Sequence, residues 1–213
     1  QNTFVYDKTN KKLIYTTNVS DESFVVVETY KKGTDVVLEC VNHGEYTVLL
    51  TTENTNYVLS YSSKITVNKR DIEVKAVSQV LTYGETVKTL DYETTNTLDA
   101  EPLTFDLVSN YQPVYGNYVI SIVQATSQTD AEKELFANYN ITFTSGTITV
   151  NKKLVYVIPD EKQTKVYGEA DENITYRVSG LLDGDTLSGS LSRVQGENIG
   201  YYDITIGSLS NGN

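Results

Sequence analysis

The chain has 213 residues and a formal net charge of −11, with 17 basic and 28 acidic side chains. The basic residues are scattered, which argues against a nucleic-acid partner, because nucleic-acid binding requires a clustered positive surface. No stretch approaches the roughly 20 consecutive apolar residues of a transmembrane helix. Cys40 is the single cysteine, so no intrachain disulfide can form.

The aromatic residues are mostly tyrosine, since the chain has 17 Tyr, 5 Phe and no Trp. Apolar residues make up 39% of the sequence, which is enough to build hydrophobic cores. Tyr, Thr, Val and Ile suit the half-buried, pleated surface of a β-strand. The composition therefore predicts an all-β protein.

One short segment occurs three times, as Gly44–Val48, Gly116–Ile120 and Gly200–Ile204. In each copy the apolar residues stand at alternate positions after the glycine, which is the pattern of a strand with one buried face. Three copies of this strand indicate that the chain is built from repeats.

Other segments recur at nearly the same spacing. Asn56–Tyr61 matches Asn138–Phe143, and Ile65–Arg70 matches Ile148–Lys153. The pair Tyr83-Gly84 recurs as Tyr167-Gly168, 84 residues later, and Tyr6-Asp7 is a looser counterpart upstream. A period of about 80 residues is long enough for each repeat to have its own core.

We therefore predict an elongated tandem array of three small β-domains, at residues 1–69, 70–152 and 153–213. Immunoglobulin-like β-sandwiches are the favoured architecture, and β-grasp-like units are the alternative. Neither connection between units contains Gly or Pro, so we expect the connections to be short and stiff. The segment after Gln128 begins with Thr129–Glu132, which has the spacing of a helix capping box, and predicts one helical turn in an inserted loop.

The third unit resembles the MBG domain, which occurs in tandem arrays in large bacterial surface proteins and adhesins. The residues that carry the resemblance are Val166–Gly168, Ser179–Leu187, Gly196–Ile204 and Gly207–Leu209. Residues 71–152 share Tyr83-Gly84 and the final strand, but we align Thr104–Val108 with the loop that contains Gly-Asp-Thr-Leu in the third unit. The first unit is similar to a sister subtype. The resemblance implies display on the bacterial cell surface and a role in adhesion or spacing.

The third unit stops before the two strands that close the other units. An incomplete sheet leaves an unpaired edge, which invites strand addition from another chain. Neighbouring copies of the protein are therefore expected partners at this C-terminal edge, and a boundary of the sequence or a disordered end is the simpler alternative. If the protein is exported, we expect its targeting and anchoring segments to lie outside this sequence.

The sequence contains few groups that are suited to catalysis or to metal binding. Cys40 and His43 suggest a nucleophile and a base, but they have no third group and no counterpart in the other units. One His and one Cys are too few ligands for zinc. Asp183–Asp185 and Glu169–Glu172 contain oxygen ligands for calcium, but they also fit ordinary turn chemistry. We predict no catalytic residue, no metal ligand and no cofactor.

The favoured function is that of a non-enzymatic structural or adhesive repeat region of an extracellular bacterial surface protein. The alternative is a module that binds a host glycan or a host protein. Exposed tyrosines would suit a sugar-binding platform, but Tyr46, Tyr118 and Tyr202 stand at inward positions, which favours a role in the core. Lys–Asn isopeptide bonds would replace the absent disulfides, and their pairing cannot be deduced from the sequence.

Overall fold

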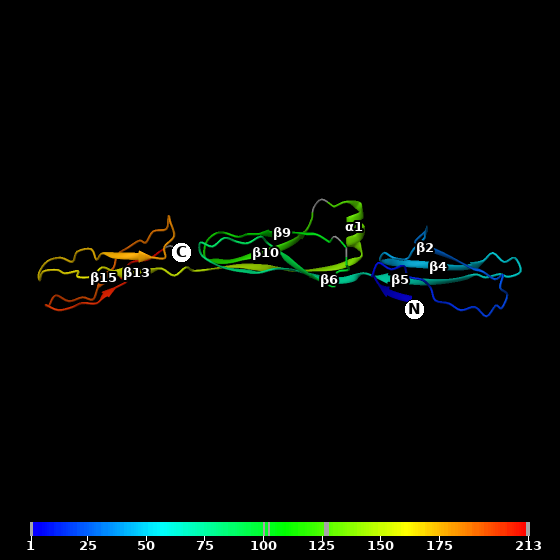
Figure 1. Ribbon diagram of the computed structural model, residues 1–213, viewed down its shortest axis with the longest axis horizontal. Coiled ribbons are helices and arrows are strands. Elements are labelled where there is room, and N and C mark those ends of the chain that lie inside the picture. The colour runs from blue at the N-terminus through cyan, green and yellow to red at the C-terminus, as the bar shows by residue number, and fades with distance from the viewer. Residues whose placement is uncertain (1, 100, 102, 126–127, 212–213) are drawn as a thin grey trace. The chain divides into compact units, whose positions relative to one another are not determined.

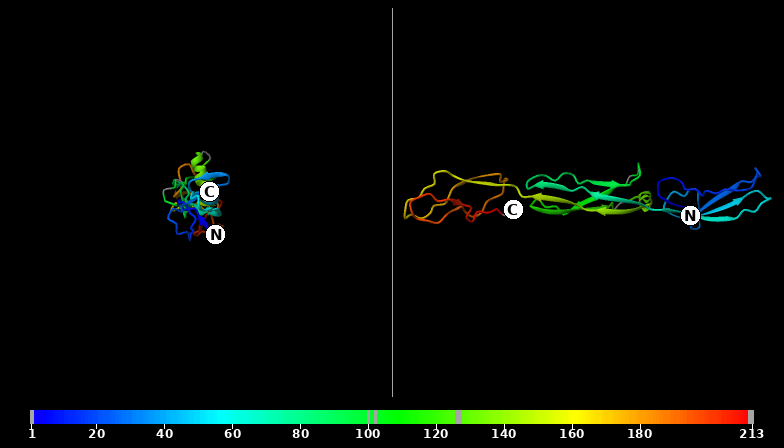
Figure 2. Two further views of the ribbon diagram at one scale, coloured as in Figure 1. Left: turned by 90° about the vertical axis from the view of Figure 1, so that its right-hand side faces the viewer. Right: turned by 90° about the horizontal axis from the view of Figure 1, so that it is seen from below.

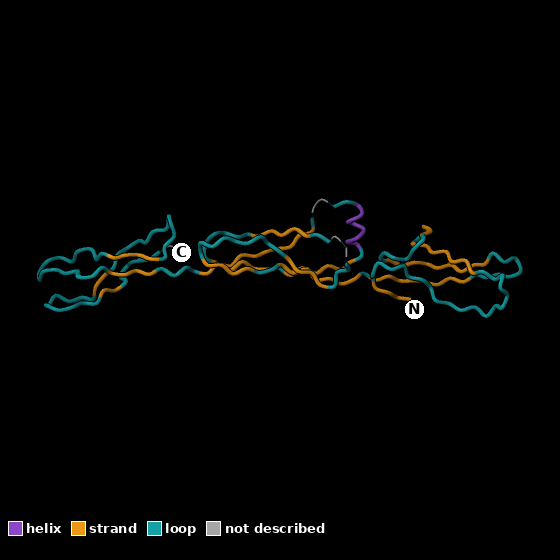
Figure 3. The backbone as a smooth tube through the Cα atoms, viewed as in Figure 1, coloured by secondary structure: helices purple, strands orange, loops and turns teal. Residues whose placement is uncertain are grey.

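The computed structural model describes residues 2–99, 101, 103–125 and 128–211. These residues form β-strands, turns and one helix, α1 (Asp130–Ala137) (Figure 1, Figure 3). The prediction of an all-β protein is therefore confirmed.

The chain folds into two compact units, each made of three segments. Unit 1 contains Gln1–Val77, Leu90–Val108 and Ser121–Gly146, and unit 2 contains Ser78–Thr89, Ser109–Ile120 and Thr147–Asn213. Each predicted boundary between repeats, near residue 70 and near residue 152, therefore lies inside one of the units. The division into three repeats stays a prediction.

The first sheet belongs to unit 1 and has five strands (Figure 1, Figure 2). Its strand order is β1 (Asn2–Val5), β5 (Tyr61–Asn68), β4 (Gly44–Thr52), β2 (Val26–Lys32) and β3 (Asp35–Val37). β1 runs parallel to β5, and the other neighbours are antiparallel. The first strand of this repeat thus lies beside its last strand.

β4 and β5 supply most of the buried side chains of the first sheet. Tyr46, Val48 and Leu50 of β4 are buried, and Tyr46 stands opposite the buried Ile65 of β5. Val67 of β5 is also buried. The alternation that was predicted after Gly44 is confirmed in this strand.

A second sheet of unit 1 has the order β11 (Tyr139–Thr144), β6 (Arg70–Ala76) and β8 (Tyr92–Thr95). β6 runs parallel to β11 over six residue pairs and antiparallel to β8. Beside this sheet, the ring of Phe105 makes edge-to-face contacts with three other aromatic rings at centroid distances of 5.5–5.6 Å. These rings belong to Tyr92, Phe136 and Phe143.

A four-stranded sheet has the order β7 (Gln79–Thr82), β12 (Gly146–Asn151), β10 (Gly116–Gln124) and β9 (Phe105–Ser109). β7 runs parallel to β12. Ile120 and Ile148 are fully buried in unit 2, and Val150 is nearly so. The parallel pair β7 and β12 repeats the arrangement of β1 and β5.

The helix α1 forms where the capping box predicted a helical turn. The hydroxyl of Thr129 accepts a hydrogen bond from the amide of Glu132, and the carboxylate of Glu132 accepts one from the amide of Thr129. The helix has eight residues, so the prediction of a single turn was too short. Phe136 in the last turn is buried, and this packing accounts for the extra length.

The third repeat has less strand and a smaller core. β13 (Tyr156–Pro159) pairs with β14 (Tyr176–Ser179), and β15 (Ser192–Arg193) pairs with β16 (Ile204–Thr205). Leu191 and Leu209 are its buried apolar residues among those that the structure describes.

The prediction that a strand begins at Gly200 was wrong, because only Ile204 and Thr205 of that copy are in a strand, and Ile206 is exposed. In the first copy, β4 pairs with β5 along most of its length. Among the residues that the structure describes, the third copy has only the short pairing of β16 with β15.

Four charged side chains connect the strands and turns of the third repeat. Lys165 and Arg193 each form ion pairs with both Asp171 and Glu197, at distances of 2.8–3.1 Å. The Arg193 guanidinium also lies over the ring of Tyr202, 4.9 Å from its centroid. The cations lower the pKa values of the two carboxylates, mainly through Arg193 at Asp171 and Lys165 at Glu197.

We expect the third repeat to be destabilised by acid. A carboxylate whose pKa is lowered in the folded state contributes stability at neutral pH, and this contribution is lost as the pH falls below about 4. Arg193→Gln should therefore lower the urea midpoint of residues 153–213 at pH 6 and change it much less at pH 3, as followed by hydrogen exchange. An equal loss at both pH values would contradict a stabilising role for these ion pairs.

Candidate functional site

The three tyrosines of the repeated strand make the same contact. Each hydroxyl donates a hydrogen bond to the backbone carbonyl four residues earlier, at 2.5–2.9 Å. The pairs are Tyr46 with Asn42, Tyr118 with Val114, and Tyr202 with Asn198. Tyr46 is buried and the other two are half-buried. These hydroxyls are used to fix the chain before the strand, so the rings do not form an exposed platform for a sugar.

The repeated pair Tyr83-Gly84 and Tyr167-Gly168 forms two turns that have the same geometry. In the Thr82–Glu85 turn, the amide of the last residue donates to the carbonyl of the first at 2.9 Å, and in the Val166–Glu169 turn the same distance is 3.1 Å. Gly84 and Gly168 have φ angles of +93° and +86°, which glycine adopts without strain. We call these two segments the tyrosine turns.

The first of these turns contacts a loop of the third repeat inside unit 2. The hydroxyl of Tyr83 donates a hydrogen bond to Oδ1 of Asp185 at 3.0 Å, and this bond raises the pKa of Tyr83. A Cβ atom added to Gly84 would lie 2.4 Å from Cδ1 of Leu182. The same loop thus supplies a carboxylate for the tyrosine and an apolar side chain for the glycine.

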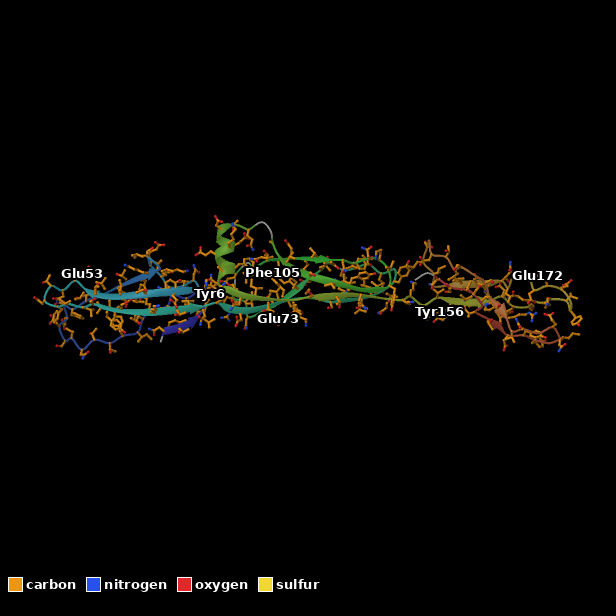
Figure 4. All side chains as sticks on the ribbon, turned by 180° about the vertical axis from the view of Figure 1, so that it is seen from behind. Tyr6, Glu53, Glu73, Phe105, Tyr156 and Glu172 are labelled. Atoms are coloured by element: carbon orange, nitrogen blue, oxygen red, sulfur yellow. The ribbon has the colours of Figure 1, made fainter. Side chains whose placement is uncertain are left out.

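An equivalent contact occurs inside unit 1, at Tyr6, which is labelled in Figure 4. The hydroxyl of Tyr6 donates to Oε1 of Glu101 at 2.8 Å, and the ring packs edge-to-face on Tyr139. The Tyr6 side chain is buried, and the Glu101 side chain is only 3% exposed. Burial and the neighbouring carboxylate together raise the pKa of Tyr6 strongly. We call the Tyr6–Glu101 and Tyr83–Asp185 contacts the two joints.

The loops that accept these hydrogen bonds are copies of one another. Leu98, Asp99, Glu101 and Leu103 stand 84 residues before Leu182, Asp183, Asp185 and Leu187. In both loops the amide of the acidic residue donates to the carbonyl of the first leucine, at 3.4 and 3.1 Å. The residue two positions before that leucine has a positive φ in each, +60° at Asn96 and +93° at Gly180. We call the described residues of 96–103, together with residues 180–187, the joint loops.

The sequence comparison missed the first joint loop. It aligned Thr104–Val108 with the Gly-Asp-Thr-Leu loop of the third repeat, whereas in the structure Asn96, Leu98 and Glu101 are the residues that share the geometry of that loop. The offset of 84 residues between Tyr83 and Tyr167 would have identified the correct alignment. The signal was weak because Asn replaces Gly and Glu replaces Asp.

Charged side chains add contacts to the joint of unit 1. Nζ of Lys8 donates to the carbonyl of Asp99 at 2.5 Å and lies 3.8 Å from the Glu101 carboxylate. Nε of Arg70 donates to the carbonyl of Asn96 at 2.7 Å. The first joint loop therefore accepts hydrogen bonds from two cationic side chains, Lys8 and Arg70, in addition to the bond from Tyr6.

The inserted helix also contributes to this joint. Asn138, which caps the C-terminus of α1, is 2% exposed. Its Oδ1 atom accepts a hydrogen bond from the amide of His43 at 2.7 Å, and its Nδ2 atom donates to Oδ1 of Asn42 at 3.2 Å. Asn42 in turn donates to Oε1 of Glu134 in the helix at 2.6 Å. The capping box, which predicted the helix, gave no indication of this contact.

The geometry does not favour nucleophilic chemistry at Cys40 and His43. The Cys40 side chain is fully buried, and burial raises its pKa to about 11, so the group is a neutral thiol at pH 7. Burial, together with Lys69 and Lys32, lowers the pKa of His43. The backbone around both residues is used in hydrogen bonds to Asn10 and Asn138.

The acidic residues that were considered for calcium make other contacts. Asp185 accepts the Tyr83 hydroxyl, and Asp171 is paired with Lys165 and Arg193. Among the residues that the structure describes, no group of three or more His, Cys, Asp or Glu side chains is arranged to hold a metal ion. Within the same described residues, no helix is long and apolar enough to cross a membrane.

Comparison with known proteins identifies one part of the chain. Residues 156–213 match the MBG domain (YGX type) family, which confirms the resemblance that the sequence predicted for the third unit. The match includes the second tyrosine turn and the second joint loop. No curated protein and no solved structure matches the chain.

We expect the Tyr6 hydroxyl to stabilise unit 1. Tyr6→Phe leaves the buried Glu101 carboxylate without its donor, which should lower the free energy of unfolding by about 2 kcal/mol. Urea denaturation measures this loss. Tyr167→Phe is the matched control and should have no effect, because Tyr167 is 72% exposed. Equal effects of the two substitutions would show that the hydrogen bond to Glu101 is not important.

The two glycines of the tyrosine turns provide a second matched test. Gly84→Ala and Gly168→Ala both place a side chain at positive φ, which costs about 1 kcal/mol in each. Only Gly84→Ala also clashes with Leu182, because nothing lies within 4 Å of a Cβ atom at Gly168. The urea midpoint of unit 2 should therefore fall more for Gly84→Ala. Equal losses would mean that Leu182 does not pack firmly on the turn.

Proposed function

We propose that the chain is a non-enzymatic repeat region of an extracellular bacterial surface protein and acts as a force-bearing stalk. The MBG match over residues 156–213 supports assignment to a surface-protein repeat region. The buried, neutral thiol of Cys40 supports the absence of nucleophilic catalysis. The stalk function rests on the way in which the strands of the repeats are paired.

The observation that carries the proposal is the parallel pairing of the first and last strands of a repeat. β1 is paired with β5 in the first repeat, and β6 and β7 are paired with β11 and β12 in the second. The chain enters a repeat at one end of such a ladder and leaves it at the other end. Tension along the chain therefore loads all the hydrogen bonds of the ladder in shear, so that they must break together.

The backbone of each joint tyrosine extends a parallel ladder by one hydrogen bond, and its side chain contacts the next repeat. The amide of Tyr6 donates to the carbonyl of Asn68 at 2.9 Å, directly after β1 and β5, and the amide of Tyr83 donates to Asn151 at 2.8 Å, directly after β7 and β12. The side chain of each tyrosine then binds the joint loop. A load on one repeat is thus passed to the next through a hydrogen-bonded contact as well as through the chain.

We expect the second repeat to resist force in one direction only. Handles attached to Cys side chains at Asp71→Cys and Lys152→Cys pull on opposite ends of the ladders and should require a high unfolding force. Handles at Asp71→Cys and Asn140→Cys lie on paired residues near one end of the β6–β11 ladder, so the hydrogen bonds break one at a time and the force should be low. Single-molecule force spectroscopy under reducing conditions measures both forces.

The comparison keeps the fold nearly constant and changes the direction of pulling. Cys40 is fully buried, so it should remain unlabelled in the folded protein. Similar unfolding forces in the two geometries would contradict a role of the parallel ladders in bearing load.

A further inference from the structure

The second tyrosine turn has the geometry of the first but no contact of the same kind. Val166–Glu169 repeats the hydrogen bond and the glycine φ of Thr82–Glu85. A Cβ atom at Gly84 would meet Leu182 at 2.4 Å, whereas nothing lies within 4 Å of a Cβ atom at Gly168. The space beside Gly168 is therefore open at the place where a joint loop covers Gly84.

The tyrosine of the second turn, Tyr167, is also exposed to solvent. Tyr167 is 72% exposed and the neighbouring Val166 is 66% exposed, whereas Tyr6 of the first joint is 4% exposed. Tyr6 and Tyr83 both use their hydroxyls to bind a carboxylate of a joint loop. Tyr167 is thus exposed at a turn whose two equivalents have a buried tyrosine, Tyr6, and a half-buried one, Tyr83.

The two existing joints define the chemistry of the missing occupant. It needs a leucine to fill the space beside Gly168 and a carboxylate, three positions later, to accept the Tyr167 hydroxyl, because Leu182 and Asp185 meet Gly84 and Tyr83 in this way. The occupant is therefore a Leu-Asp-x-acid loop, with Asp or Glu at the last position.

A second copy of this chain does not offer such a loop. The joint loops at 96–103 and 180–187 are already bound by Tyr6 and Tyr83. In the first repeat the equivalent turn is Asp21–Phe24, where the amide of Phe24 donates to the carbonyl of Asp21 at 3.0 Å. This turn has Phe24 at the position of the carboxylate, so it cannot accept a tyrosine hydroxyl there.

We propose that the Val166–Glu169 turn is the docking site for a third joint, filled by the Leu-Asp-x-acid loop of a further repeat joined after the third one in the same polypeptide. The covalent connection favours this source, because a contact of a few side chains gains from the high effective concentration of a linked partner. The proposal does not depend on whether the repeats bear force.

The test extends the full chain with a second copy of residues 138–213. The added residues 138–151 supply copies of β11 and β12, which we call the closing strands, and the added residues 152–213 supply a further copy of the third repeat with its own joint loop. Nitration of tyrosines with tetranitromethane, mapped by mass spectrometry, reports the exposure of each phenol. In the added copy the residue equivalent to Tyr167 is changed to Phe, so that the peptide containing Tyr167 is unique.

We expect Tyr167 to lose its reactivity in the extended chain and to become as unreactive as Tyr6. Tyr201, which is fully exposed, is the reactive reference. The reactivity of Tyr167 should return when Leu182→Ala and Asp185→Asn are introduced into the added copy alone. It should also persist in a chain that is extended only by residues 138–151, because closing the third repeat does not supply a joint loop.

Three results would overturn the proposal. Tyr167 could remain as reactive as Tyr201 in the extended chain, or it could already be protected by the closing strands alone. Protection that increases with protein concentration in the unextended chain would assign the site to a second copy instead. A further measurement does not need the extension: Leu182→Ala with Asp185→Asn in the original chain should make Tyr83 more reactive, and no change there would also contradict the proposal.

Discussion

Within each unit, a loop is held by a hydrogen bond from a tyrosine hydroxyl to a carboxylate. It occurs between Tyr6 and Glu101 and between Tyr83 and Asp185, and in each case the tyrosine follows the last pair of a parallel ladder. A hydrogen bond to a charged acceptor is stronger than one between neutral groups, and burial increases the cost of losing it. The contact is therefore able to hold a loop of one repeat on the end of the preceding repeat.

The two joints share this contact and differ in what surrounds it. In unit 1 the tyrosine is buried, and Lys8, Arg70 and the helix cap Asn138 add hydrogen bonds. In unit 2 the packing of Leu182 against Gly84 takes the place of these polar contacts. The first joint is thus mainly polar and the second is more apolar, although both bind the same kind of loop. One loop pattern can therefore serve repeats with different insertions.

Much of the fold could be predicted from the sequence, because the strand after Gly44 and the cap at Thr129 depend on local patterns. The strand predicted at Gly200 failed, since a strand also needs a neighbour to pair with, and this requirement is not visible in the strand itself. The joints were recognised only in part. Tyr83-Gly84 was identified as a landmark, but its partner loop was misaligned, because Glu101 and Asp185 differ in type and lie far from the tyrosines in sequence.

The central claim is that the tyrosine joint fixes the third repeat against the end of the second within unit 2. Double electron–electron resonance spectroscopy, with spin labels at Asn117→Cys and Arg177→Cys, measures the distribution of distances across this joint. A narrow distribution that broadens when Tyr83→Phe and Leu182→Ala are combined is the predicted result. A broad distribution in the unaltered joint, or one that the two substitutions leave unchanged, would contradict the account.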